Sequence, residues 1–260
     1  MDRDHFLEVV RRGPVLAALA EGPLSPRDLT DRLDHSRSTV HRIATRLEEA
    51  GLVERGRGEL ELTPLGDAVA AELRAFECNV RAAHRLEPLL ECFEDLPFDF
   101  DVERFADATV TESEPGNPYR PVQRFMSLVE DTGTLRGADP AAINPLHLDA
   151  LHQAILDGME TDAIFRRDVV EELVRNNPER ARTAFESGNL TLRARDEVTF
   201  GLTLCDDRVG VSVYDQDTGM MELYADTDAE AAREWGERVF EALLEDAETI
   251  DWENHLVGDD

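Results

Sequence analysis

Residues 25–62 predict two short helices joined by a tight turn and followed by a hairpin, and this order constrains the fold more than any other feature. Ser25 precedes Pro26 and lies three residues before Asp28, the pattern of an N-cap with a capping box and a proline at the first helical position. Ser36 is placed to cap the next helix, whose apolar residues recur at spacings of three and four and share one face. Such a pair of helices is typical of a helix-turn-helix.

The segment after these helices predicts a hairpin. Residues 52–63 alternate between apolar and polar side chains on either side of a glycine-rich tip, which is the signature of two short antiparallel strands. Upstream, residues 4–12 and 14–19 each show the apolar stripe of a short helix. Helices followed by a hairpin are the element order of a winged helix-turn-helix, and we assign this fold to residues 1–66.

The charge of the chain is strongly negative and unevenly distributed. No lysine is present: 27 arginines face 57 acidic residues, for a formal net charge of −30. Such a surface stays hydrated in concentrated salt, which indicates a cytoplasmic protein of a halophile. Residues 1–66 hold 10 arginines and 12 acidic residues (net −2), whereas residues 67–260 hold 17 and 45 (net −28). The first quarter therefore contributes little of the repulsion that DNA would meet.

The second helix of the pair has a polar face without acidic residues between positions 35 and 47. If Val40, Ile43 and Leu47 face the core, arginine, histidine and hydroxyl side chains face solvent. Arginine can donate two hydrogen bonds to guanine in the major groove, and hydroxyls and free N–H groups at a helix start can bind phosphate. We therefore predict that double-stranded DNA is contacted by Ser25, Ser36, Arg37, Ser38, Thr39, His41, Arg42, Thr45 and Arg46, and by Arg55 and Arg57 at the hairpin tip.

A long helix is predicted after the hairpin, and residues 67–95 are assigned as a linker and dimerisation segment. Its apolar residues step by three and four positions, a short heptad-like seam that indicates pairing with a second copy. A homodimer would present two reading helices to a pseudo-palindromic operator. The predicted dimer contacts are Val69, Leu73, Phe76 and Val80.

The rest of the chain predicts an α/β domain over residues 96–250, with residues 251–260 as a tail. Predicted helices alternate with predicted strands, of which the first spans residues 105–111, and a series of strands with Asp-rich turns follows. This alternation indicates a mixed sheet, so the whole chain belongs to the α+β or α/β class. Trp235, Val239 and Leu243 mark the core face of a closing helix.

Two parts of the chain resemble known families. Residues 24–62 resemble the winged helix-turn-helix of MarR-, ArsR- and TrmB-type archaeal and bacterial regulators. The run that carries the likeness, residues 24–66, reads LSPRDLTDRLDHSRSTVHRIATRLEEAGLVERGRGELELTPLG. The later part resembles the FilR1-type effector domain of archaeal regulators related to the methanogenesis regulator family, in ATVTESEPGNPYRPVQRFMSLVED, NPLHLDALHQAILDG and FGLTLCDDRVGVSVYDQDTGMMELY. The resemblance implies a sequence-specific transcription regulator whose DNA binding is modulated by a sensory domain.

The effector half contains candidate ligand contacts but no enzyme signature. GxSxG, Walker A, HExxH and GxGxxG motifs are absent, and an HxK pair is impossible without lysine. The three cysteines lack metal-ligand spacing, and no apolar run is long enough to span a membrane. We therefore expect no enzymatic activity, metal, cofactor or membrane partner. A small-molecule effector would contact Arg120, Arg124, His147, Phe200 and Tyr214.

A second hypothesis comes from the cysteines. Cys78 and Cys92 are fourteen residues apart, so both could face a dimer partner along one helix. The protein would then be a small-molecule or thiol-redox sensor that acts through protein–protein contacts, with the winged helix as an interaction module. Binding to DNA distinguishes the two hypotheses.

Overall fold

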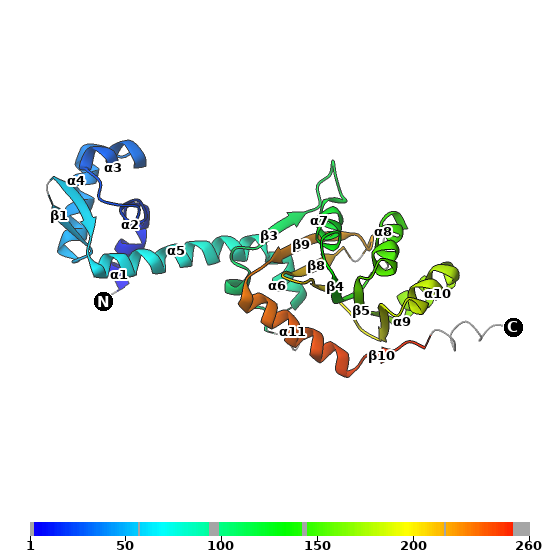
Figure 1. Cartoon of the computed structure of the whole chain (residues 1–260). Coiled ribbons are helices and arrows are strands. Elements are labelled where there is room, and N and C mark those ends of the chain that lie inside the picture. Colours follow the sequence, from blue (N-terminus) through cyan, green and yellow to red (C-terminus); the bar gives the residue numbers. More distant parts are fainter. Residues whose placement is uncertain (1–2, 57, 94–98, 142–144, 216, 252–260) are drawn as a thin grey trace. The chain divides into compact units, whose positions relative to one another are not determined.

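The computed structural model describes residues 3–56, 58–93, 99–141, 145–215 and 217–251 (Figure 1). The chain divides into two compact units, Met1–Arg81 and Ala82–Asp260. Helix α5 (Pro64–Arg85) contains the boundary between them. Most of this helix lies in residues 67–95, the segment that the sequence assigned to a linker, but it begins three residues earlier, at Pro64.

The N-terminal unit has the element order predicted for a winged helix-turn-helix. Each predicted helix is present, and the hairpin forms with Val53 opposite Leu62. The elements are α1 (Arg3–Arg11), α2 (Gly13–Leu19), α3 (Pro26–Leu33), α4 (Arg37–Glu49), β1 (Val53–Gly56) and β2 (Glu59–Leu62).

Local hydrogen bonds start α3 and α4 where the sequence predicted. Ser25 Oγ accepts the Asp28 N–H at 3.2 Å, and the Asp28 carboxylate accepts the Ser25 N–H at 3.1 Å, which completes the capping box. Ser36 Oγ accepts the Thr39 N–H at 3.2 Å. Between the helices, Asp34 adopts a left-handed conformation with φ 49° and reverses the chain in a short turn.

The core of this unit fixes the orientation of α4. Its apolar residues Val40, Ile43 and Leu47 are buried against the other helices and the hairpin. Leu24 and Leu60 exchange backbone hydrogen bonds of 3.0 and 2.9 Å, which ties the segment before α3 to the wing. The opposite face of α4 is therefore held outward by packing on its inner face.

The C-terminal unit is built, within the described residues, on an eight-stranded mixed sheet. Its strand order is β10-β6-β5-β4-β7-β8-β9-β3. Strands β4, β5 and β6 are parallel and are joined by helical crossovers, whereas the other pairs are antiparallel. The strands are β3 (Thr109–Glu112), β4 (Thr134–Asp139), β5 (Glu160–Arg166), β6 (Leu190–Arg195), β7 (Gly201–Leu204), β8 (Val209–Tyr214), β9 (Met221–Thr227) and β10 (Glu248–Thr249).

Helices cover both faces of this sheet. Because side chains alternate along a strand, Leu202 of β7 packs toward α11, whereas its neighbour Thr203 faces the opposite side. The first face carries α6 (Glu87–Phe93), the 3₁₀ helix η1 (Val102–Phe105) and α11 (Glu230–Glu245). The second carries α7 (Arg120–Val129), α8 (Pro145–Leu156), α9 (Arg167–Asn176) and α10 (Pro178–Glu186).

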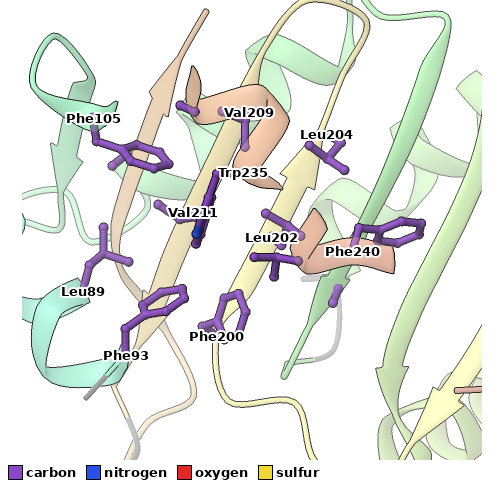
Figure 2. Close-up of a cluster of buried hydrophobic side chains, with 14 of the residues drawn as sticks. Leu89, Phe93, Phe105, Phe200, Leu202, Leu204, Val209, Val211, Trp235 and Phe240 are labelled. Carbon is purple, nitrogen blue, oxygen red and sulfur yellow. The ribbon is translucent and has the colours of Figure 1, made fainter. Parts of the chain in front are cut away.

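An aromatic cluster fills the core of the first face (Figure 2). The Phe93 ring centroid lies 4.5 Å from that of Phe200 and 5.7 Å from that of Trp235. Phe105 meets Trp235 edge-on at 5.5 Å. Trp235 Nε1 donates a 2.8 Å hydrogen bond to the Asp99 carbonyl, which satisfies its polar edge. The predicted core face of the closing helix is therefore confirmed.

Two details differ from the sequence prediction. The strand predicted over residues 105–111 begins at Thr109, because the Asp101 side chain accepts the Glu103 N–H at 3.0 Å and starts the 3₁₀ helix that ends at Phe105. The short strand β10 was not predicted. Within the described residues, the helices are too short or too polar for a membrane span.

Candidate DNA interface and effector cavity

The exposed face of α4 carries the side chains that the sequence assigned to DNA. Arg37, Ser38, His41 and Arg42 are all exposed. Within the part of the chain that the structure describes, Arg37 and Arg42 make no ion pair, so both guanidinium groups keep their donors for another molecule. These two arginines form the centre of the candidate interface.

Hydroxyl groups cluster at the N-terminus of α4. Ser36 Oγ lies 2.9 Å from both Ser38 Oγ and Thr39 Oγ1. Thr45, two turns along the helix, donates its hydroxyl to the His41 carbonyl at 3.0 Å and keeps its oxygen as an acceptor. The N-terminal cluster adds hydroxyls to the positive end of the helix dipole, a combination that suits a phosphate group.

Two other arginines of the candidate interface, Arg46 and Arg55, form ion pairs with acidic side chains. Arg46 forms a 2.6 Å ion pair with Glu8, which also binds Arg12 at 2.6 Å. The hydrogen bond from Arg46, followed by that from Arg12, lowers the pKa of Glu8. Arg55 Nε lies 2.8 and 2.9 Å from the two carboxylate oxygens of Glu48.

The remaining predicted DNA contacts have different outcomes. Ser25 Oγ donates to Asp28 at 2.6 Å as part of the capping box, so its hydroxyl already serves the helix start. Arg57 lies outside the described residues. Among the predicted arginine contacts that the structure describes, Arg37 and Arg42, both on α4, are the ones without an ion pair.

The seam predicted for dimerisation divides into two parts. Val69 and Leu73 pack partly buried against the core of the N-terminal unit itself. Phe76 and Val80 leave 59% and 40% of their surface exposed. Only the second pair is thus left with apolar surface for a partner.

A cavity of about 320 Å³ lies on the second face of the large sheet. Strands β4, β5 and β6 form its floor, and α7, α8 and α10 form much of its wall. Most of the lining is apolar, including Phe125, Leu151, Ile155 and Leu192. A cavity of this size and character suits a small organic molecule.

A hydrogen-bonded acidic group lies in the wall of the cavity. Asp139 ends β4, Tyr214 ends β8, and the Tyr214 hydroxyl donates to Asp139 Oδ2 at 2.5 Å. The Ala141 N–H donates to Asp139 Oδ1 at 2.9 Å. Burial raises the pKa of Asp139 to about 6, although both hydrogen bonds favour its charged form. Burial and the neighbouring Asp139 charge raise the pKa of Tyr214 as well.

The structure brings two of the five predicted ligand residues to this cavity. His147 and Tyr214 line it. Phe200 packs in the aromatic core with 2% of its surface exposed, so its predicted role as a ligand contact is corrected. The arginines are engaged elsewhere, Arg120 with Glu114 and Arg124 with Asp226, and neither lines the cavity.

Arg124 belongs to a buried ion cluster. It donates two 2.8 Å hydrogen bonds to Asp226, which is fully buried, and Arg208 binds the same carboxylate at 2.6 and 2.9 Å. The hydrogen bond to Asp226 raises the pKa of Arg124. Asp226 therefore connects α7 to the sheet, and this contact gives Arg124 a structural role.

The sequence analysis missed the polar lining residues Asp139, Asn177 and His152. His152 Nε2 lies 2.9 Å from Thr183 Oγ1, a contact between α8 and α10. The position of Asp139 at the end of a predicted strand was an available signal, because ligands in open α/β sheets often bind at carboxyl ends of strands. Among 57 acidic residues, that signal does not single it out.

The cysteine hypothesis loses its geometric basis. Helix α5 ends at Arg85 and Cys92 lies in α6, so Cys78 and Cys92 do not share one helix. Cys92 is partly buried beside the aromatic core, and burial raises its pKa. Burial also raises the pKa of Cys205 to about 11. A raised pKa disfavours the reactive thiolate form that a redox sensor needs.

Family models match both parts of the chain. Residues 118–246 match the family described as "Methanogenesis regulatory protein FilR1, middle domain", and residues 1–85 match the HVO_A0261 N-terminal domain. Residues 118–246 therefore form a domain similar to the FilR1 middle domain, here called the FilR1-type domain. The cavity and the Asp226 cluster lie within this FilR1-type domain. The chain thus combines a winged helix-turn-helix with a FilR1-type domain, and this combination is that of a DNA-binding transcription regulator.

Solved structures give more distant likenesses. TrmBL2, described as an archaeal chromatin protein with a novel mode of DNA binding, aligns over 94% of both chains with 18% identity and a TM-score of 0.44. The phospholipase D family member Nuc from Salmonella typhimurium aligns over 55% of this chain and 97% of its own, with 13% identity and a TM-score of 0.43. Scores this low do not establish a shared fold. No curated protein sequence matches the chain significantly.

Proposed function

We propose that this protein is a sequence-specific DNA-binding transcription regulator that inserts α4 into the major groove as a homodimer. The observation that carries the proposal is the exposed, acid-free face of α4, where Arg37 and Arg42 project beside the hydroxyls of Ser36 and Ser38. Arginine suits guanine recognition, and the capped helix start suits a phosphate. The remaining surface repels DNA, because residues 67–260 carry a net charge of −28.

The pairing of two subunits is part of this proposal. A single α4 offers few base contacts, and two copies would read two half-sites of a pseudo-palindromic operator. The exposed apolar side chains of Phe76 and Val80 on α5 support an interface along that helix. The lysine-free acidic composition supports the cytoplasm of a halophilic archaeon as the setting.

The FilR1-type domain is proposed to modulate DNA binding in response to a small molecule. Its cavity has the volume and the apolar lining of a ligand site, with Tyr214, His147 and Asp139 as polar contacts. The described residues contain no group of three or more His, Cys, Asp or Glu side chains placed to hold a metal. The apolar lining of the cavity supports an organic molecule as the proposed signal.

Selection of bound genomic fragments by the full-length protein tests this function. Sheared genomic DNA from a halophilic archaeon is incubated with the protein in KCl, and retained fragments are sequenced and footprinted. The proposal expects a shared pseudo-palindromic motif with protected half-sites about one helical turn apart. Retention of fragments without a common motif, or no retention at any salt concentration, contradicts it.

A further inference from the structure

We propose that the cavity of the FilR1-type domain binds a mostly apolar small molecule with one cationic amine, and that Asp139 is the counter-ion of this amine. The inference deepens the proposed sensory role of the domain, on which it rests, by naming the chemical class of the ligand. Three features of the cavity support it: its apolar lining, the free acceptor sites of Asp139, and the ion pairs that already occupy the arginines of the wall.

The shape and lining of the cavity favour an apolar ligand body. The volume of about 320 Å³ exceeds what a single ion or a few water molecules would need. Phe125 and Met126 of α7, Leu151 and Ile155 of α8, and Leu192 of β6 line the space between the sheet and the helices. Water molecules find few hydrogen-bond partners on such walls, whereas an aromatic or aliphatic molecule would bury apolar area there.

Asp139 is the group that determines the charge of the ligand. Its two carboxylate oxygens each accept one hydrogen bond from the protein, one from the Ala141 N–H and one from the Tyr214 hydroxyl. A carboxylate has about four acceptor sites, so both oxygens can accept further donors. An ammonium group would supply donors and an opposite charge together, which stabilises a partly buried carboxylate in apolar surroundings.

The other charged residues of the lining already have partners. Arg136 binds Glu237 and lies over the Phe240 ring, and Arg180 binds Asp149. Two histidines, His147 and His152, also line the cavity. Because both arginines are engaged, a ligand carboxylate would find no unpaired arginine among the described lining residues and would place a second negative charge beside Asp139. The cavity therefore discriminates against anions.

The electrostatic state of Asp139 agrees with this geometry. Burial raises its pKa to about 6, so that the carboxylate is largely ionised at neutral pH but without a full counter-charge. A bound ammonium group would favour the ionised form further. Proton release from Asp139 on ligand binding would therefore be largest below pH 6.

Three probes with one ring system and different head groups test the inference. Calorimetric titration of the full-length protein in KCl compares naphthylmethylamine, naphthylmethanol and naphthoate. We expect the amine to bind about tenfold or more tightly than the alcohol, and naphthoate to bind weakest. In Asp139→Asn, the preference for the amine over the alcohol should disappear while the alcohol still binds. Asp131→Asn, which makes the same charge change at an exposed position outside the cavity, should keep the preference.

Several outcomes would overturn the inference. They are naphthoate binding as tightly as the amine, an unchanged amine preference in Asp139→Asn, and no binding of any probe. The ranking of the three probes on the unsubstituted protein decides the question even if Asp139→Asn does not fold. The titration contains no DNA, so a negative result here leaves the proposed DNA-binding function standing, and a failure to bind DNA leaves this result standing.

Discussion

The contact between the wing and the start of α5 gives a prediction about stability in the N-terminal unit. A Cβ atom added at Gly66 would lie 1.9 Å from the backbone oxygen of Leu52 and 3.2 Å from Leu62 Cδ2. The Leu52 oxygen is fixed, because it accepts the Thr63 N–H at 3.0 Å. Gly66→Ala must therefore push α5 away from the hairpin.

The magnitude follows from the two opposing effects of the methyl group. Overpacking against a backbone atom costs about 1–3 kcal/mol of stability. Replacing glycine with alanine in a helix stabilises the fold by about 0.5–1 kcal/mol and partly offsets this cost. Because the contact with the backbone oxygen would be only 1.9 Å, the overpacking cost lies in the upper part of its range. We therefore expect a net loss of about 1–2 kcal/mol, which lowers the unfolding temperature of a unit of this size by about 4–16 °C. Gly13→Ala is the matched control, because its Cβ would meet only Leu73 Cδ1, at 3.9 Å. It should be neutral or slightly stabilising.

Calorimetry of the full-length protein in molar KCl measures this difference. Both tryptophans, Trp235 and Trp252, lie beyond the N-terminal unit, so their fluorescence reports on the C-terminal unit. We expect Gly66→Ala to lower a calorimetric transition while the tryptophan transition stays in place. Equal stability of the Gly66→Ala and Gly13→Ala variants would refute the close approach between Leu52 and α5.

Three further predictions concern charged groups. Glu8→Gln should release Arg46 and tighten DNA binding by about two- to fivefold, measured by fluorescence anisotropy; unchanged or weaker binding would show that Glu8 does not restrain the interface. Because the pKa of Asp139 rises from 3.8 to about 6 on folding, the folded protein holds a proton that the unfolded chain releases between these pH values, and stability falls as pH rises through this window. Urea titrations should therefore show Asp139→Asn gaining about 1–3 kcal/mol over the unsubstituted protein between about pH 4 and pH 7, and a pH-independent difference would contradict this. Asp226→Asn should lower stability by about 3 kcal/mol or more in urea titrations followed by tryptophan fluorescence, whereas the exposed Asp228→Asn should change it by less than about 1 kcal/mol; equal effects would argue against the buried cluster.

The winged helix was predictable because its determinants are local. The capping box of Ser25 and Asp28 and the cap of Ser36 on Thr39 each join residues three apart, so the sequence shows both partners together. The three- and four-residue spacing of the apolar side chains of α4, which begins at Val40, is likewise visible within one helix. What the sequence did not show was the pairing of Arg46 with a glutamate 38 residues away.

The contacts of the FilR1-type domain were less predictable because they join residues that are distant in sequence. Asp139 and Tyr214 are 75 residues apart, and Arg124 and Asp226 are 102 apart. A sequence with many acidic residues and arginines permits many such pairs, and only the strand order decides which of them form. Phe200 illustrates the same problem, since an aromatic residue beside a strand is equally suited to a core and to a ligand site.

The most direct test of the central claim is the contribution of Arg42 to specific DNA binding. Fluorescence anisotropy on a selected operator fragment, with a scrambled fragment alongside, compares Arg42→Ala with Arg74→Ala, which removes the same charge from an exposed position on α5. We predict that Arg42→Ala loses about 1–3 kcal/mol of binding to the operator and less to the scrambled fragment. Arg74→Ala should bind both fragments as the unsubstituted protein does. An Arg42→Ala variant that binds the operator with undiminished affinity, or both variants losing the same amount on both fragments, would contradict the assignment of α4 as the reading helix.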